Sequence, residues 1–112
     1  MQLPRVKEID AESLRARLEA GEPLRLLDIR SDREVLRGVL PQAEHLPMHE
    51  LPLRMDELST DQELVLYCLS GARSYHACTY LAQQGFDNVV NLRGGIIDWA
   101  RNGFSLEPPL AN

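Results

Sequence analysis

The stretch "ELVLYCLSGARSYHACTYLAQQG" (residues 63–85) changes from apolar to polar and back to amphipathic. Residues 63–67 are rich in Leu, Val and Tyr, which favours a buried strand. Residues 74–85 place small and apolar side chains on one helical face, and a glycine stands where that helix would end. A strand, a short loop and a helix are therefore expected in direct succession. Such units build parallel sheets, because a helix is the usual crossover between parallel strands.

The rest of the chain continues the same alternation. Asp10 is a suitable N-cap for a helix over 11–20, and Ser31 is one for a helix over 31–38. Pro52 predicts an irregular or short helical stretch at 48–58. The remaining elements expected are strands at 6–9, 24–29, 44–46 and 88–92, and a helix at 94–103. The sequence thus predicts an α/β fold with a mostly parallel five-stranded sheet and helices on both faces.

Length and composition indicate a compact soluble domain. The 112 residues suffice for one domain (1–112), with a core at about 5–107 and a loose C-terminal tail. With 44% apolar residues, 26% charged residues and a net charge of −5, the chain lacks the clustered basic residues of a nucleic-acid-binding protein. No signal peptide and no membrane-spanning stretch is recognised, so we expect a cytoplasmic protein with no membrane partner. Oligomeric state cannot be predicted from the sequence.

Cysteine and histidine spacing argues against a metal centre. The two cysteines, Cys68 and Cys78, are too few for a disulfide framework. The three histidines, His45, His49 and His76, have no metal-ligand spacing with one another or with the cysteines. We therefore predict no bound metal and no cofactor, and an exposed position for His76.

Cys68 stands directly after the best strand, where ligand sites of parallel sheets lie. The first amides of the following helix have no intrahelical partner, and a loop that curls would direct them at one point. Gly71 permits such a turn, and Arg73 adds a permanent positive charge. Cysteines in such surroundings have pKa values of roughly 3.5–7.5, against about 8.5 for an ordinary thiol. Cys68 is therefore the candidate nucleophile, as an accessible thiolate that needs no separate base.

Other interpretations of the cysteines remain open. Cys68 could instead be an inert core residue at a strand end. Cys78 shares a helix face with other small and apolar residues, which favours a core position over a redox partnership with Cys68. Trp99 is expected in the core, and the pair Gly94–Gly95 would permit a sharp turn into the last helix.

Three motifs in register resemble the rhodanese-type sulfurtransferases. "YCLSGARS" (67–74) is similar to the active-site loop of that family, a six-residue loop from cysteine to arginine followed by a helix. "LLDIRSDREVLRGVLPQAEHLP" (26–47) resembles its first signature. "GFDNVVNLRGGIIDWARNGFSLE" (85–107) resembles its C-terminal signature. The resemblance covers roughly residues 5–107 and implies a three-layer rhodanese-like domain.

The resemblance also implies a reaction. Cys68 would take a sulfane sulfur from thiosulfate, a polysulfide or a protein persulfide, become a persulfide, and pass the sulfur to a thiol or cyanide. The family's loop binds the substrate, which here implies Leu69, Ser70, Gly71, Ala72 and Arg73. Structural support is implied for Asp28, Arg30, Glu34 and Ser74. The Arg73 side chain could face the site or brace the loop against a carboxylate such as Glu34.

The sequence departs from the family pattern at three positions. Leu69 stands where a basic or polar residue is common, so we expect modest thiosulfate activity and a preference for a less charged or protein-bound donor. Val39 and Gln42 replace a frequent histidine and glycine, which affects a turn more than the chemistry.

Two other functional classes remain as alternatives. A non-catalytic or sulfur-carrier regulatory module would share the same residues. A cysteine phosphatase or arsenate reductase would usually have one more loop residue between its cysteine and its arginine.

Overall fold

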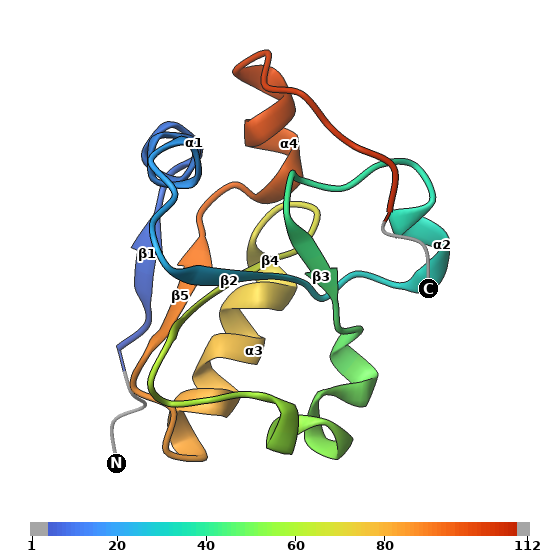
Figure 1. Cartoon of the computed structure of the whole chain (residues 1–112). Coiled ribbons are helices and arrows are strands. Elements are labelled where there is room, and N and C mark those ends of the chain that lie inside the picture. Colours follow the sequence, from blue (N-terminus) through green and yellow to red (C-terminus); the bar gives the residue numbers. More distant parts are fainter. Residues whose placement is uncertain (1–4, 110–112) are drawn as a thin grey trace.

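Five parallel strands form the centre of the molecule in the computed structural model, which describes residues 5–109 (Figure 1). The strand order is β1-β5-β4-β2-β3, and each of the four neighbouring pairs is parallel. The strands are β1 (Lys7–Ile9), β2 (Leu24–Asp28), β3 (Ala43–His45), β4 (Glu63–Tyr67) and β5 (Val89–Leu92). The predicted α/β fold with a five-stranded parallel sheet is confirmed. The end of the predicted loose tail, 110–112, lies outside the described residues.

Helices cover both faces of this sheet. The chain forms α1 (Ala11–Glu19), α2 (Asp32–Val35), α3 (Ala72–Gln83) and α4 (Gly95–Arg101), with two short 3₁₀ turns, η1 (Met48–Leu53) and η2 (Met55–Glu57). In Figure 1, α1 and α4 lie above the sheet and α3 lies below it. Within residues 5–109, no helix combines the length and the apolar character that crossing a membrane requires.

The alternation of side chains along β4 separates two hydrophobic cores. Leu64, Leu66 and Cys68 point to the face covered by α3 and η1. Val65 and Tyr67 point to the opposite face, where α1 and α4 pack. Because β4 is the central strand and is buried on both faces, its sequence is an almost continuous apolar run. Cys68 is thus the last residue of the α3-side core, at the point where the chain leaves the sheet.

Two expected caps are present. The Asp10 carboxylate accepts a hydrogen bond of 2.8 Å from the Ser13 amide at the start of α1. Ser31 and Glu34 form a reciprocal capping box at the start of α2. This box holds Glu34 on the first turn of α2, from which its carboxylate reaches α3.

The predicted helices differ from the observed ones in their bounds, most of all those predicted at 31–38 and 74–85. Helix α2 ends at Val35 and is followed by a turn, so it is shorter than the predicted 31–38. Helix α3 begins at Ala72 rather than at residue 74. The reason is Gly71, whose φ of +100° turns the chain directly into the helix. Arg73 therefore belongs to the first helical turn, and the connection between strand and helix is shorter than the predicted loop.

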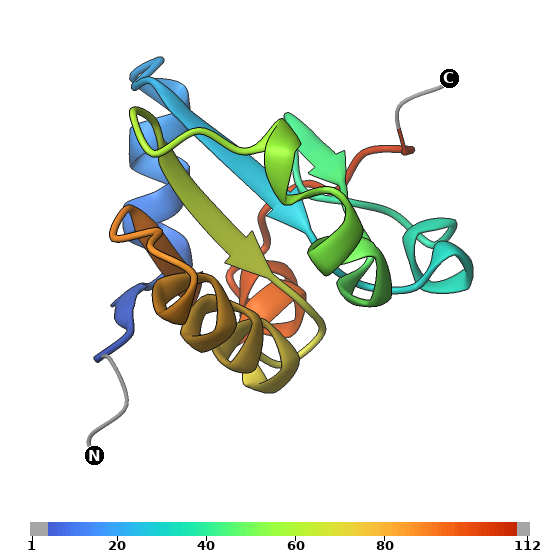
Figure 2. The ribbon, with the colours of Figure 1, turned by 90° about the horizontal axis from the view of Figure 1, so that it is seen from below.

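The carboxyl ends of β2, β4 and β5 meet at one edge of the sheet. Figure 2 shows the arrowhead of β4 directed at the turn that leads into α3, with α4 beside it. This convergence brings the turn after β4, the polar end of β2 and the start of α4 together.

Candidate active site

The sulfur of Cys68 lies inside the turn between β4 and α3. The Gly71 amide donates a hydrogen bond to Sγ over 3.2 Å, and the Ser74 amide donates one over 3.4 Å. The Ser74 hydroxyl also lies 3.4 Å from Sγ. Both amides belong to the start of α3, where helix N–H groups are free and the helix dipole favours a negative charge. The turn therefore forms a cradle for an anionic sulfur.

These contacts shift the ionisation of the thiol. Burial is the largest single influence and acts to raise the pKa of Cys68. Hydrogen bonds from the Ser74 hydroxyl and from the amides of Ser74, Gly71 and Ser70 together outweigh burial, and the pKa of Cys68 is lowered from its ordinary value. A lowered pKa makes the thiolate, which is the nucleophilic form, more abundant at neutral pH.

The same cradle restricts access to the sulfur. Cys68 is only 1% exposed, although the sequence leads us to expect an accessible thiolate. The physical reason is that the amides can reach the sulfur only by wrapping it. Leu69, Ser70 and Ala72 are exposed and form the outer side of the turn.

The first turn of helix α4 is hydrogen-bonded to the backbone of the turn that contains Cys68. The amides of Ile96 and Ile97 donate hydrogen bonds of 3.0 and 3.1 Å to the carbonyls of Cys68 and Leu69. At Gly95, a Cβ atom would lie 2.6 Å from the Cys68 carbonyl oxygen, so no side chain fits there. The two carbonyls are thus turned away from the sulfur and paired with the first turn of α4.

Arg73 braces the turn instead of facing the sulfur. Its guanidinium donates two hydrogen bonds of 2.8 Å to the two carboxylate oxygens of Glu34. The Arg73 hydrogen bonds lower the pKa of Glu34 to about 2, and the pKa of Arg73 is raised in turn. Of the two alternatives for this side chain, the structure has the second: Arg73 pairs with Glu34, which joins α3 to α2 and offsets the arginine charge.

Asp28 and Arg30 form a separate buried pair at the end of β2. The Arg30 Nη2 atom lies 2.7 Å from Asp28 Oδ2 and also donates to the Gly38 carbonyl over 2.7 Å. Both side chains are almost fully buried. Because each is satisfied by the other and by the backbone, the pair fixes the turn between β2 and β3 and does not contact Cys68.

Comparison with known proteins places this geometry in a family. Residues 10–102 match the model of the rhodanese-like domain. The chain belongs to the rhodanese-like domain family. A sulfurtransferase of Allochromatium vinosum is 54% identical over 93% of this chain and 97% of its own. A putative sulfurtransferase of Bacillus subtilis is 45% identical over 84% of this chain and 90% of its own.

A solved structure agrees with this assignment. The crystal structure of a rhodanese-like domain protein from Staphylococcus aureus superposes with a TM-score of 0.84 at 29% identity, and covers 94% of this chain and 100% of that one. The predicted family and its fold are therefore confirmed.

The contacts that two residues make around the Cys68 sulfur are not predicted by the sequence. Ser74 is expected to give only structural support, but both its amide and its hydroxyl lie against the sulfur. Asn91 was not singled out, although it is 1% exposed and bonds Ser74. The available signal was a polar residue inside the apolar strand "NVVNL", since an inward polar side chain needs a partner.

Cys78 is fully buried in the α3-side core. Burial, with smaller contributions from the charges of Glu8 and Cys68, raises the pKa of Cys78 to about 12. Cys78 is therefore a protonated thiol at neutral pH, which agrees with the core position favoured by the sequence.

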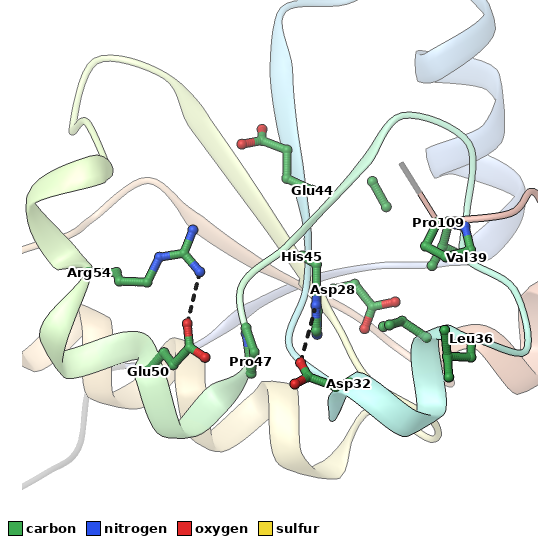
Figure 3. Close-up of a pocket in the computed structure, with 12 residues that line it drawn as sticks. Asp28, Asp32, Leu36, Val39, Glu44, His45, Pro47, Glu50, Arg54 and Pro109 are labelled. Carbon is green, nitrogen blue, oxygen red and sulfur yellow. Dashed lines mark hydrogen bonds and ion pairs between the residues drawn. The ribbon is translucent and has the colours of Figure 1, made fainter. Parts of the chain in front are cut away.

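A groove of about 560 Å³ lies beside β3 (Figure 3). Its polar side chains are largely paired: Glu50 bonds Arg54, and His45 lies 3.8 Å from Asp32. Cys68 is not among the residues that line it. In the part of the chain that the structure describes, no three His, Cys, Asp or Glu side chains gather as a metal site would require.

Proposed function

We propose that this chain is a sulfurtransferase that carries sulfur as a persulfide on Cys68. The observation that carries the proposal is the set of hydrogen bonds from Gly71 and Ser74 to a thiol whose pKa is lowered. Membership of the rhodanese-like family and the names of the Allochromatium and Bacillus relatives support sulfur transfer in general.

The proposed reaction has two steps. In the first, the Cys68 thiolate attacks the outer sulfur of a donor, the S–S bond of the donor breaks, and sulfite or a thiolate leaves. The negative charge then resides on the outer sulfur of Cys68–S–S⁻. In the second, cyanide or an acceptor thiolate attacks that outer sulfur and the Cys68 thiolate is restored. In each step the electron pair of the attacking nucleophile forms the new bond and the pair of the broken bond departs with the leaving group, so the reaction balances without an external oxidant, reductant or base.

The cradle would assist both steps by electrostatics. The amides of Gly71 and Ser74 stabilise the thiolate before attack and again when it leaves. The amides of Leu69, Ser70, Ala72 and Arg73 are proposed to bind the donor or the outer sulfur. Asp28–Arg30 and Arg73–Glu34 are proposed as supports, which hold the turns of β2 and β4 at a fixed separation.

The surface around the cradle favours a weakly charged donor. Leu69 is 43% exposed beside the site, and the charge of Arg73 is offset by Glu34. A dianion such as thiosulfate therefore meets little positive charge at the opening. An organic or protein persulfide carries one negative charge and is the donor class we propose, with a thiol as the physiological acceptor class.

Intact mass measurement tests the reaction type. The protein is incubated with polysulfide or thiosulfate, and we expect a gain of about one sulfur atom that cyanide removes. Cys68→Ala must gain nothing, and Cys78→Ala must gain sulfur as the wild type does. A protein that gains no sulfur, or gains it equally in Cys68→Ala, would overturn the proposal.

A sulfur-carrier role is the second candidate, because Cys68 is only 1% exposed. A carrier would load sulfur and discharge it only to a docked partner. This alternative would be favoured if Cys68 gained sulfur much faster than the loaded protein passed sulfur to free thiols. Hydrolysis of phosphate esters that is lost in Cys68→Ser would instead favour the phosphatase class.

A further inference from the structure

The thiol is connected to the surface through two buried polar side chains, Ser74 and Asn91, which lead to the exposed Glu8. Asn91 lies on β5 among the apolar residues of the α3-side core and is 1% exposed. Its amide nitrogen donates to Glu8 Oε2 over 2.9 Å, and its Oδ1 lies 2.5 Å from the Ser74 hydroxyl. The Ser74 hydroxyl in turn lies 3.4 Å from Cys68 Sγ.

The surroundings of Asn91 fix which end of its amide faces Ser74. Its nitrogen has two acceptors, Glu8 Oε2 at 2.9 Å and the Gly71 carbonyl at 3.3 Å. A flipped amide would direct an oxygen at two other oxygens, with no proton between them. The Asn91 oxygen must therefore face Ser74.

Ser74 has one hydroxyl proton and three neighbours that could accept it. The distances are 2.5 Å to Asn91 Oδ1, 3.3 Å to the Gly71 carbonyl and 3.4 Å to Cys68 Sγ. The Gly71 carbonyl already accepts from the Tyr75 amide at 3.0 Å and from Asn91. Two oxygens 2.5 Å apart require a proton between them, and Asn91 Oδ1 has none to give. The hydroxyl proton therefore points to Asn91.

We propose that Asn91 is a positioning residue that competes with Cys68 for the hydroxyl proton of Ser74. In the thiol state, Ser74 donates to Asn91 and its lone pairs accept the S–H of Cys68. When the sulfur loses its proton, the hydroxyl turns to donate to Sγ and gives up its bond to Asn91. Asn91 thus sets how readily the thiolate forms. Its importance for sulfur transfer rests on the proposed function, whereas its effect on the thiol does not.

Few charged or titratable groups face this chain of bonds. Glu8 approaches from β1 and Cys78 from α3, and burial keeps Cys78 protonated by raising its pKa to about 12. The Arg73–Glu34 pair lies on the α2 side of the cradle. Substitution of Asn91 keeps these four groups in the chain but removes the hydrogen bond that Glu8 Oε2 accepts. A changed titration of Cys68 is therefore assigned to the Ser74 proton only where the Ser74→Ala background abolishes it.

The test is a pH titration of the thiolate by ultraviolet absorbance, with the Cys68→Ala spectrum subtracted. Asn91→Leu removes the competing acceptor while Gly71 keeps its Tyr75 donor. We expect its thiolate fraction below the midpoint to rise about threefold to tenfold over wild type, the effect of one hydrogen bond. Ser74→Ala removes the donor and must lower the thiolate fraction. Asn102→Leu, an exposed asparagine on the far end of α4, must change nothing.

A double-mutant cycle separates this role from a general structural one. If Asn91 acts only through Ser74, Asn91→Leu has no further effect in the Ser74→Ala background. An unchanged or lowered thiolate fraction in Asn91→Leu, or an equal effect in both backgrounds, would overturn the inference. Asn91→Val replaces the leucine variant if that one does not fold.

The wild-type protein offers an independent measurement. At low pH, the infrared S–H band of Cys68, isolated by subtracting Cys68→Ala, should lie at the lowered frequency of an S–H that donates to oxygen. A band at the frequency of an unbonded thiol contradicts the proposal. Neither experiment uses a sulfur donor. A protein that fails to load sulfur would therefore contradict the proposed function without affecting the test of Asn91.

Discussion

The Arg73 guanidinium and the Glu34 carboxylate face each other in parallel, with both hydrogen bonds at 2.8 Å. The pair joins the first turn of α3 to α2, whose own start is capped by the same glutamate. One carboxylate therefore fixes the position of the cradle and withdraws the arginine charge from it.

Glu34→Gln should lower stability at neutral pH by about 0.5–1 kcal/mol, because the pair is partly exposed and screened by water. The folded-state pKa of Glu34 is lowered from 4.5 to about 2, so the stabilisation is complete above 4.5 and is lost as the pH falls towards 2. Denaturant midpoints across this range should show the two proteins converging in acid. Glu19→Gln, in the exposed pair with Arg15, should show no measurable change. A difference that persists undiminished at the acid end contradicts the assignment.

Leu69→Arg should raise kcat/KM for thiosulfate in the cyanide assay about threefold to tenfold, because it adds a positive charge where the dianion must approach. Leu106→Arg is the matched control, since Leu106 is 40% exposed, close to the 43% of Leu69, and lies outside the loop. Equal gains in both variants would indicate a nonspecific effect of net charge. No gain for Leu69→Arg would count against the idea that a lack of positive charge near the site limits turnover of thiosulfate.

Gly95→Ala should destabilise the fold by about 2–4 kcal/mol, the sum of backbone strain and overpacking, and should slow sulfur loading. Its new Cβ would lie 2.6 Å from the Cys68 carbonyl. Gly21→Ala is the control, because Gly21 has a φ of +71° and open space around it. That variant should lose about 1 kcal/mol from strain alone. Thermal or denaturant unfolding measures both, and equal losses would mean that close packing on the turn is unimportant.

Bulky thiol reagents should label native Cys68 at least about tenfold more slowly than they label the denatured chain, since Cys68 is 1% exposed. Small polysulfides should still load it. Labelling followed by mass spectrometry distinguishes the two, and Cys78→Ala shows that the signal comes from Cys68. Labelling of the native protein at the denatured rate would show that the cradle opens readily.

Much of the fold follows from the sequence. The strands at 63–67 and 24–29 are predicted to within a residue or two, because strands of a parallel sheet covered on both faces are mostly apolar. The start of α3 at Ala72 is missed, since it depends on the positive φ of Gly71. Sequence permits that conformation at a glycine without requiring it.

The candidate site is only partly predictable for a related reason. Cys68 and its turn are contiguous in the sequence, so their proximity is local. The pairing of Arg73 with Glu34 and of Ser74 with Asn91 depends on how α2, α3 and β5 pack. Two alternatives for Arg73 therefore remain open until the positions of these elements are known. Asn91 becomes meaningful only once the register of β1 against β5 places Glu8 beside it.

The hydrogen bond between Glu8 and Asn91 closes a loop of 83 residues. The environment of the sulfur accordingly draws on both ends of the chain, and ordering it requires the first and last strands to meet. We expect contacts of such long range to form late in folding, because loop closure must be accomplished before they can stabilise the chain. The ionisation of Cys68 would thus report whether β1 has docked on β5, and fraying of that edge strand would change it.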